Sequence, residues 1–456
     1  MKKLKQMSQN FTQVSPFILS NTLIIIPYFI FLGLTTINDW HSIIPFVLFY
    51  TFRMTGIFLI RGIPRSIDSF TLLISSLLLG GIGTIVGVLG RSYFPLYDLS
   101  AICLGLSASW LIPAKTTVDY HERSQGFQTM TTKGYLYALI PLGILFYATT
   151  LPDTYRIGVT LGIYTLIFVL AYYTVRRYPS YDLDFKDVPG QLLLKRELGA
   201  FIVFFILLFL LRSSRLLLNS EEFDFALVLF TLLFVVVAAY MGRSVKQWKL
   251  PRWLNLFGFY TGMIGNFLFL FGTLYAGSVF GYSKLAVTLY LPYGVGLILA
   301  MFLFKKIKDQ LQNEAIFSFL TISFVVGLSL LLVPQLFSIG IFIISFAKSC
   351  SSSWLNQVYY ELPVIPKDQR ILAKTSTQNK GSIVFQFSLM VGLLYLAEKY
   401  NVSTMFLLQV TVKKASGEMA TLIMEVAKYA SVLVLLIGIL SVIFIKRKEA
   451  KYENIH

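Results

Sequence analysis

Long apolar runs separated by short polar segments dominate the chain. About fourteen runs of roughly 17 to 25 residues are long enough to cross the ~30 Å hydrocarbon core of a bilayer as helices. Strands of a membrane barrel would alternate apolar and polar residues, and a run such as Phe204 to Leu211 does not alternate. The pattern predicts an all-α polytopic membrane protein. The expected spans lie near 17–35, 42–60, 69–90, 97–114, 135–151, 157–174, 199–218, 224–241, 254–276, 285–304, 315–333, 336–354, 382–398 and 427–445.

A short polar-aromatic sequence occurs twice and indicates a duplicated unit. Ser107–Trp110 (SASW) recurs as Ser351–Trp354 (SSSW), and each copy closes an apolar run that is followed by a polar loop and a Lys-Gly pair. Transporters are commonly built from structural repeats of this kind. If both copies close the fourth helix of a six-helix bundle, two helices must lie between the bundles. We therefore expect an N-terminal bundle at 1–175, a cytoplasmic linker with two inserted helices at 176–252, and a C-terminal bundle at 253–456.

Composition and charge support a membrane protein with one basic side. The chain is 56% hydrophobic and 13% charged, whereas roughly a quarter of the residues of a soluble domain are charged. Basic residues favour cytoplasmic loops, and the dense clusters fall in alternate loops, which predicts cytoplasmic termini and an even number of spans. The net charge of +17 is explained by basic loops that face anionic lipid, so no nucleic-acid partner is expected. The Lys- and Ile-rich composition favours a bacterial cell membrane. The clusters are Lys2/Lys3/Lys5, Arg61/Arg65, Lys115/Arg123/Lys133, Arg176/Arg177/Lys195/Arg196, Arg243/Lys246/Lys249/Arg252, Lys305/Lys306/Lys308, Lys367/Arg370/Lys374/Lys380 and Lys446/Arg447/Lys448.

The segment between the second and third spans carries a family resemblance. Gly56, Arg61, Gly62 and Arg65 fit the spacing of the motif that the major facilitator superfamily has at this place, and the helix plan resembles its fourteen-helix branch of drug and tetracycline efflux proteins. The resemblance implies that these four residues take part in gating the cytoplasmic side. Ile60 stands where the family has an acid that joins the gating network.

Two other motifs of that branch are only partly present in this sequence. Ala101 and Ile102 occupy the region where the family has an Arg in its fourth helix, and Tyr137–Gly143 keeps one Pro and one Gly of the antiporter motif. The acidic residues all fall near the predicted ends of spans, among them Asp39, Asp98 and Glu425. A proton-driven exporter of cationic drugs needs a buried carboxylate, so the motifs do not support antiport and leave the coupling ion open.

The ionisable side chains predicted inside spans are basic. Charged groups in the bilayer core are costly and usually serve a solute or ion pathway, which singles out Lys348 and Arg53. In the superfamily the first and fourth helices of each bundle line the central cavity, so the resemblance implies that Lys348 binds an anionic solute. Ser351, Asn356 and Gln357 are predicted to lie nearby or further along the same helix. The alternative for Lys348 is that it snorkels towards the cytoplasm. For Arg53 an ion pair or snorkelling is the favoured alternative to solute contact.

Two tryptophans and two arginines remain to be placed. Trp110 and Trp354 are expected either in the interfacial aromatic belt or as a matched pair of aromatic gates. Arg212 and Arg215 are expected to anchor the first inserted helix at the lipid headgroups.

These features predict a secondary transporter that exports or flips an amphiphilic or anionic solute by alternating access between two bundles. The expected partners are a small-molecule or lipid-like solute and membrane lipids, and the chain is expected to act as a monomer. Two cysteines and three histidines form no metal or catalytic spacing, so neither a cofactor nor an enzyme activity is predicted. Two alternatives stay open. One is a proton-coupled multidrug or tetracycline-like antiporter that uses Asp39 or Asp98, and the other is a non-transporting membrane receptor or assembly partner.

Overall fold

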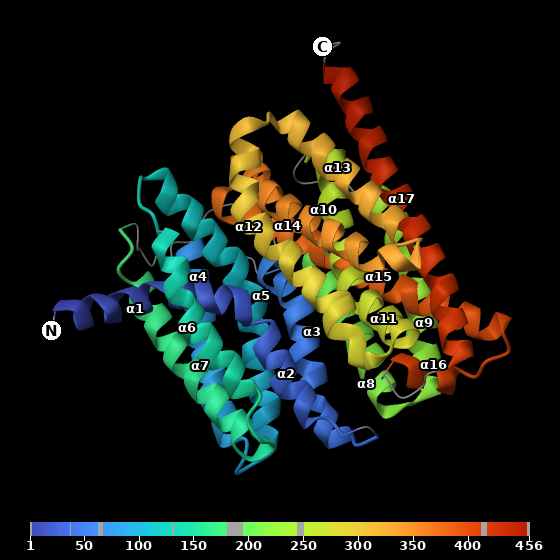
Figure 1. The fold of residues 1–456 in the computed structure, drawn as a ribbon, viewed down its shortest axis with the longest axis horizontal. Helices are drawn as coiled ribbons and strands as arrows, with labels where there is room; N and C mark the ends of the chain where they lie inside the picture. Colours follow the sequence, from blue (N-terminus) through green and yellow to red (C-terminus); the bar gives the residue numbers. More distant parts are fainter. Residues whose placement is uncertain are drawn as a thin grey trace. The chain divides into compact units, whose positions relative to one another are not determined.

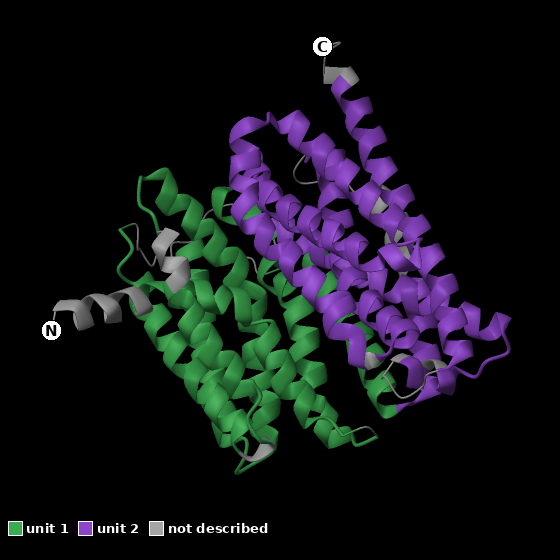
Figure 2. Ribbon diagram, viewed as in Figure 1, with its two compact units in different colours: residues 1–217, 366–372 green, residues 218–365, 373–456 purple. Residues whose placement is uncertain are grey.

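The computed structural model describes residues 2–36, 38–62, 67–129, 132–179, 195–243, 250–411 and 417–453. Within these ranges all regular structure is helical (Figure 1). The chain divides into two compact units (Figure 2), unit 1 with Met1–Leu217 and Pro366–Leu372 and unit 2 with Leu218–Ile365 and Ala373–His456. Each unit is considered by itself below.

Unit 1 contains the first eight α-helices. They are α1 (Lys2–Thr22), α2 (Ile25–Leu34), α3 (Trp40–Gly62), α4 (Ser69–Leu89), α5 (Pro95–Ser124), α6 (Thr132–Thr149), α7 (Asp153–Val175) and α8 (Lys195–Leu217). Local sequence sets several helix starts. Asp68 caps α4 by accepting a hydrogen bond of 2.6 Å from the Thr71 backbone N–H, and Pro95 occupies the first turn of α5, where its missing N–H costs nothing.

Unit 2 contains the remaining helices, except that the first residues of α15 (367–372) belong to unit 1. Two π-helical turns occur among them. The helices are α9 (Ser220–Arg243), α10 (Arg252–Asn266), α11 (Gly272–Phe280), α12 (Leu291–Gln310), α13 (Asn313–Leu330), α14 (Phe337–Glu361), α15 (Lys367–Lys399), α16 (Thr404–Thr411) and α17 (Glu418–Glu453). The π-helical turns are η1 (Phe267–Phe271), between α10 and α11, and η3 (Ala286–Tyr290), before α12, and the 3₁₀ turns are η2 (Tyr282–Lys284) and η4 (Pro334–Leu336). Gly281 ends α11 with a φ of 88°, a value that L-residues with a side chain rarely adopt.

The helices are of membrane-spanning length and composition. Over the described residues, 11 are long and apolar enough to cross a bilayer, or 12 if α1 and α2, which bend by 56°, count together as one span. This confirms the prediction of an all-α polytopic membrane protein. The span expected at 17–35 falls on the bent pair α1 and α2. The spans expected at 135–151 and 224–241 fall on α6 and α9, which are counted neither among the 11 nor as the twelfth. The count of about fourteen spans therefore stays a prediction.

Small residues allow the helices of unit 1 to pack closely. A Cβ atom added at Gly83 of α4 would lie 2.8 Å from Cys103 Cβ of α5, and one added at Gly87 would lie 2.6 Å from Ser100 Oγ. Ser107 Oγ donates a hydrogen bond of 2.7 Å to the Ser76 carbonyl across the same pair of helices. Small residues at a membrane helix interface permit this close approach, so α4 and α5 form a tight pair.

In unit 2 the backbones of α10 and α15 touch. A Cβ atom added at Gly262 would lie 1.9 Å from the Gln378 carbonyl oxygen, and one added at Gly381 would lie 2.0 Å from the Phe259 carbonyl oxygen. Only glycine fits at either position, because any larger residue would force the two helices apart.

The two helices expected as a middle segment, α8 and α9, fall in different units, and the predicted domain boundaries stay a prediction. In unit 1, α8 packs along α3, with the Phe52 and Phe205 rings 4.9 Å apart. In unit 2, Phe230 of α9 stacks on Phe387 of α15 at 4.3 Å between ring centroids. Each of the two helices is thus part of the packing of one unit.

Candidate functional site

Two lysines lie close together on α14 and α15 in unit 2. Lys374 is 4% exposed, and its ammonium group donates to Asn356 Oδ1 and lies 3.4 Å from Ser352 Oγ and 3.5 Å from the Ser352 carbonyl. Lys348 lies one turn before Ser352 on the same face of α14. It is half-buried and is near enough for its charge to act on Lys374. The Lys348 chain runs past Gly265 of α10, where an added Cβ would lie 3.5 Å from Lys348 Cε. We call Lys348, Ser352, Asn356 and Lys374 the basic cluster.

Lys374 lies on a helix, although the sequence predicts a loop at this position. The next span is expected at 382–398, but α15 begins at Lys367. The first turns of α15 carry polar side chains that face neighbouring helices. Thr377 Oγ1 donates to Asn255 Oδ1 at 3.1 Å, and Gln378 Nε2 donates to Thr261 Oγ1 at 3.0 Å. A buried polar face lowers the hydropathy of a segment without ending its helix.

Three other residues of α14 are predicted to contact the solute, and they have different surroundings. Asn356 belongs to the basic cluster. Ser351 is fully buried, and its hydroxyl has no hydrogen-bond partner among the described residues. Gln357 instead donates to Glu361 Oε1 one turn further along its own helix, at 2.7 Å. The roles of all three in solute binding remain predictions.

Two of the predicted gating residues contact each other in unit 1. Trp110 Nε1 of α5 donates a hydrogen bond of 2.8 Å to the Gly56 carbonyl of α3. A Cβ atom added at Gly56 would lie 3.0 Å from Ser109 Cβ and 3.1 Å from Leu106 Cδ2. The first residue of the motif therefore lies where α3 and α5 approach closely.

The next part of the motif contacts the start of α8. Arg61 forms an ion pair of 3.2 Å with Glu197 Oε1, and both side chains are nearly buried. An added Cβ at Gly62 would lie 3.0 Å from the Leu198 backbone nitrogen. Arg61 thus has an acidic partner, although Ile60 replaces the acid of the family motif, and α8 supplies it. Arg65 lies outside the described residues.

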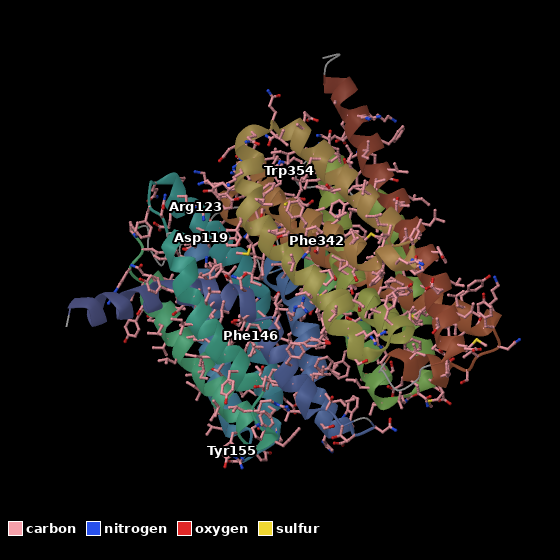
Figure 3. The ribbon with its side chains drawn as sticks, in the orientation of Figure 1. Asp119, Arg123, Phe146, Tyr155, Phe342 and Trp354 are labelled. Carbon is pink, nitrogen blue, oxygen red and sulfur yellow. The ribbon has the colours of Figure 1, made fainter. Side chains whose placement is uncertain are left out.

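Trp110 lies on α5 and Trp354 (labelled in Figure 3) lies on α14. The two side chains have different surroundings. Trp354 is 2% exposed. Its Nε1 donates to Asn313 Oδ1 at 3.3 Å, and its ring packs on Trp253 and Phe257. A position in the interfacial belt is therefore wrong for Trp354, because the ring is enclosed by the helices of unit 2. The gating role of both tryptophans stays a prediction.

Three arginines approach one region of unit 1. The Arg212 guanidinium of α8 lies 3.8 Å from the centre of the Tyr50 ring, and that of Arg53 lies 5.8 Å from the same ring. Arg212 and Arg215 are 8% and 5% exposed. The expectation that they anchor α8 at the lipid headgroups is wrong, since their side chains are buried within unit 1.

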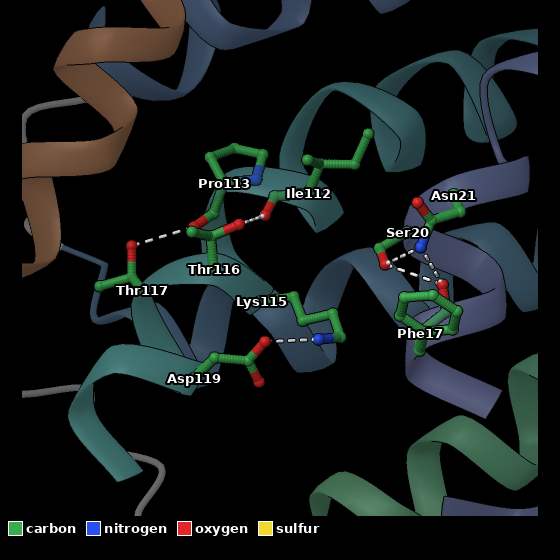
Figure 4. A network of polar contacts seen from close by, with 9 residues as sticks. All are labelled: Phe17, Ser20, Asn21, Ile112, Pro113, Lys115, Thr116, Thr117 and Asp119. Atoms are coloured by element: carbon green, nitrogen blue, oxygen red, sulfur yellow. Dashed lines mark hydrogen bonds and ion pairs between the residues drawn. The ribbon is translucent and has the colours of Figure 1, made fainter. Parts of the chain in front are cut away.

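A polar pocket of about 280 Å³ opens between α1 and α5 (Figure 4). Lys115 and Asp119 form an ion pair of 2.5 Å on one face of α5, and Arg123 follows on the same face one turn later. The sequence predicts Lys115 and Arg123 in a loop, but both lie on α5, which continues to Ser124. Burial and the nearby carboxylates of Asp119 and Glu122 raise the pKa of Tyr178, which follows α7, so this hydroxyl stays neutral. The lining residues are Phe17, Ser20, Asn21, Ile112, Lys115, Thr116, Asp119, Arg123 and Thr129.

Comparisons with known proteins identify the fold. No family model matches the chain, and no curated protein matches it. Solved structures match over nearly the whole length. An autoinhibited POT family peptide transporter is 13% identical over 96% of this chain and 95% of its own, with a TM-score of 0.51. A structure concerned with substrate recognition in proton-dependent oligopeptide transporters is 10% identical over 97% and 98%, with a TM-score of 0.52. A POT peptide transporter in complex with sulfate is 14% identical over 96% and 94%, with a TM-score of 0.52. At these identities the likeness shows the fold alone, which is similar to that of these solved transporters. The fourteen-helix efflux branch remains a prediction.

Proposed function

We propose that the protein is a secondary transporter that exports or flips an amphiphilic or anionic solute by alternating access. The fold supports a transporter in general, and the basic cluster supports the solute class. On this proposal the protein acts as a monomer in the cell membrane, with both termini on the cytoplasmic side.

The observation that carries the proposal is the pairing of Lys374 with neutral oxygens. Among the described residues, its hydrogen bonds go to Asn356 and Ser352, and no carboxylate lies within ion-pair distance. A buried cation without a counter-charge is costly, and Lys348 adds a second positive charge nearby. An anionic solute group would neutralise this charge, and ionisable groups inside spans usually mark solute pathways.

The solute class can be tested with two probes of the same size and opposite charge. Ligands that bind the native state raise its apparent stability, so the thermal unfolding of purified protein should be recorded with naphthalene-1-sulfonate and with trimethyl(1-naphthyl)ammonium. We expect stabilisation by the sulfonate only. Lys374→Met should weaken its binding by roughly ten- to a hundredfold, the effect of losing a hydrogen bond to a charged group, and Lys348→Met should act in the same direction.

Lys305→Met is the matched control, because it removes an exposed lysine of the same unit. It should leave the sulfonate effect unchanged. Stabilisation by the ammonium probe that persists in Lys374→Met would contradict the proposal and would favour a cation-exporting antiporter.

A further inference from the structure

The polar pocket between α1 and α5 in unit 1, which we call the α1–α5 pocket, contains one acidic and two basic side chains. Asp119 Oδ2 accepts a hydrogen bond of 2.5 Å from the Lys115 ammonium (Figure 4). The other oxygen, Asp119 Oδ1, is buried and has no hydrogen-bond partner among the described residues. Arg123 is exposed, and its guanidinium pairs with no carboxylate in the part of the chain that the structure describes. One oxygen and one guanidinium are thus left for a ligand.

The neutral side chains of the pocket offer hydrogen-bond acceptors. The Ser20 hydroxyl donates to the Phe17 carbonyl at 2.9 Å. The Thr116 hydroxyl donates to the Ile112 carbonyl at 2.8 Å. A hydroxyl has a single proton, so both oxygens present only lone pairs to the pocket. Together with Asp119 Oδ1, they suit a ligand group that donates several hydrogen bonds, and the charge of Asp119 favours a cationic donor such as an ammonium.

Arg123 offers the opposite charge to an anionic group. A guanidinium carries five N–H donors in a fixed plane and suits phosphate and carboxylate groups. Residues four apart on a helix lie on the same face, with Cβ atoms roughly 5 to 6 Å apart, so Asp119 and Arg123 present opposite charges at that spacing. A zwitterion with a short chain between its ammonium and its anionic group matches both.

The position of the pocket along α5 favours phosphate as the anionic group. The helix has 30 residues, which corresponds to about 45 Å at ~1.5 Å per residue and matches the thickness of a bilayer with its headgroups. By length alone, the last turns of α5, with Asp119 and Arg123, fall at the level of the lipid phosphates. Solute sites of transporters lie near the bilayer midplane instead.

We propose that the α1–α5 pocket binds a phosphoethanolamine group, with its ammonium on Asp119 Oδ1 and its phosphate on Arg123. The group belongs either to a membrane lipid or to a water-soluble phosphodiester, since both carry the same atoms. Bound there, it connects α5 to α1 through the Ser20 oxygen. The pocket shares no residue with the basic cluster, so this inference does not depend on the proposed function.

The ligand chemistry can be tested with two soluble phosphodiesters that differ only at the nitrogen. Ligands that bind the native state raise its apparent stability, so the thermal unfolding of the purified full chain should be recorded with glycerophosphoethanolamine and with glycerophosphocholine. The choline group has no N–H to donate to Asp119. We expect it to bind roughly ten- to a hundredfold more weakly, the effect of losing a hydrogen bond to a charged group. Alanyl-alanine, which has an ammonium but a carboxylate in place of the phosphate, should stabilise less than glycerophosphoethanolamine.

Three variants assign the two ends of the ligand. Asp119→Asn should remove the preference for ethanolamine over choline. Arg123→Gln should weaken the binding of both phosphodiesters, and because this side chain is exposed, misfolding of Asp119→Asn does not decide the result. Arg196→Gln is the matched control, since it removes an exposed arginine of the same unit that does not line the pocket. It should leave both affinities unchanged.

Native mass spectrometry from micelles with equal amounts of dioleoyl phosphatidylethanolamine and dioleoyl phosphatidylcholine distinguishes the two sources. Preferential retention of the ethanolamine lipid, lost in Arg123→Gln, identifies a lipid ligand. Stabilisation by glycerophosphoethanolamine without such retention identifies a soluble one. Equal effects of the two phosphodiesters, an equal effect of alanyl-alanine, or unchanged binding in Arg123→Gln would overturn the proposal. Neither stabilisation nor preferential retention would overturn it as well.

Discussion

At the scale of single residues, three buried basic side chains differ in whether an acidic partner balances their charge. This difference indicates different roles. Arg61 pairs with Glu197 and Lys428 with Glu425, so both charges are balanced inside the protein. Lys374 contacts only neutral oxygens among the described residues. A balanced pair contributes to structure, whereas an unbalanced cation is suited to bind an anion from outside.

Removing one member of the pair between α3 and α8 should be strongly destabilising. Glu197→Gln leaves the Arg61 guanidinium nearly buried without its counter-charge, which costs about 3 to 5 kcal/mol for a buried pair. The free energy of unfolding in mixed detergent micelles measures this directly.

The double variant Arg61→Met/Glu197→Leu is the control for that experiment. It removes both charges and fills similar volume, so it should lie close to the wild type. Equal stability of Glu197→Gln and the wild type would show that the ion pair contributes nothing to the attachment of α8.

At the scale of helices, glycine positions fix which elements can touch. The contact of α10 with α15 depends on Gly262 and Gly381, where the added Cβ atoms would lie within about 2 Å of backbone oxygens of the opposite helix. Backbone atoms cannot rotate away as a flexible side chain can. The two helices that carry the polar contacts next to the basic cluster are therefore held at one fixed crossing.

Gly262→Ala should disrupt this crossing. Forced overpacking costs typically about 1 to 3 kcal/mol, and the nearest atom here is a backbone carbonyl oxygen at 1.9 Å, so we expect the upper part of that range or more. The measurement is the thermal unfolding temperature, monitored as the loss of monodisperse protein on heating.

Gly294→Ala on α12 provides the comparison, because nothing lies within 4 Å of its added Cβ. It should be neutral or slightly stabilising, since Ala favours a helix over Gly by about 0.5 to 1 kcal/mol. Similar unfolding temperatures for the two variants would contradict the close crossing.

Helix positions could be predicted from hydropathy, whereas several helix ends could not. Every expected span falls on a helix, but α5, α15 and α17 extend beyond the apolar runs. The additional turns carry residues such as Lys115, Lys374 and Glu425, whose polar groups find partners on neighbouring helices or on their own helix. A sequence window counts these residues as loop because it contains no information about their partners. Lys348 could be singled out from sequence, while its neighbour Lys374 and the contacts among Tyr275, Glu425 and Lys428 required the structure.

At the scale of the whole molecule, the two copies of the repeated sequence lie in different units of the fold. The two copies of the repeated sequence lie on α5 in unit 1 and α14 in unit 2, and the fold is that of solved peptide transporters. The surroundings of the copies have diverged, since Trp110 bonds to a backbone carbonyl of α3 and Trp354 to the Asn313 side chain. Pseudo-symmetry therefore predicts where equivalent helices lie, but not which contacts their side chains make.

The most direct test of the account is uptake of naphthalene-1-sulfonate into proteoliposomes that contain the wild type, Lys348→Met/Lys374→Met or Lys305→Met. The account predicts saturable uptake by the wild type and by Lys305→Met, and its loss in the double variant with the protein still folded. Equal uptake by all three proteins, or transport of the ammonium probe in place of the sulfonate, would contradict an anion pathway through the basic cluster.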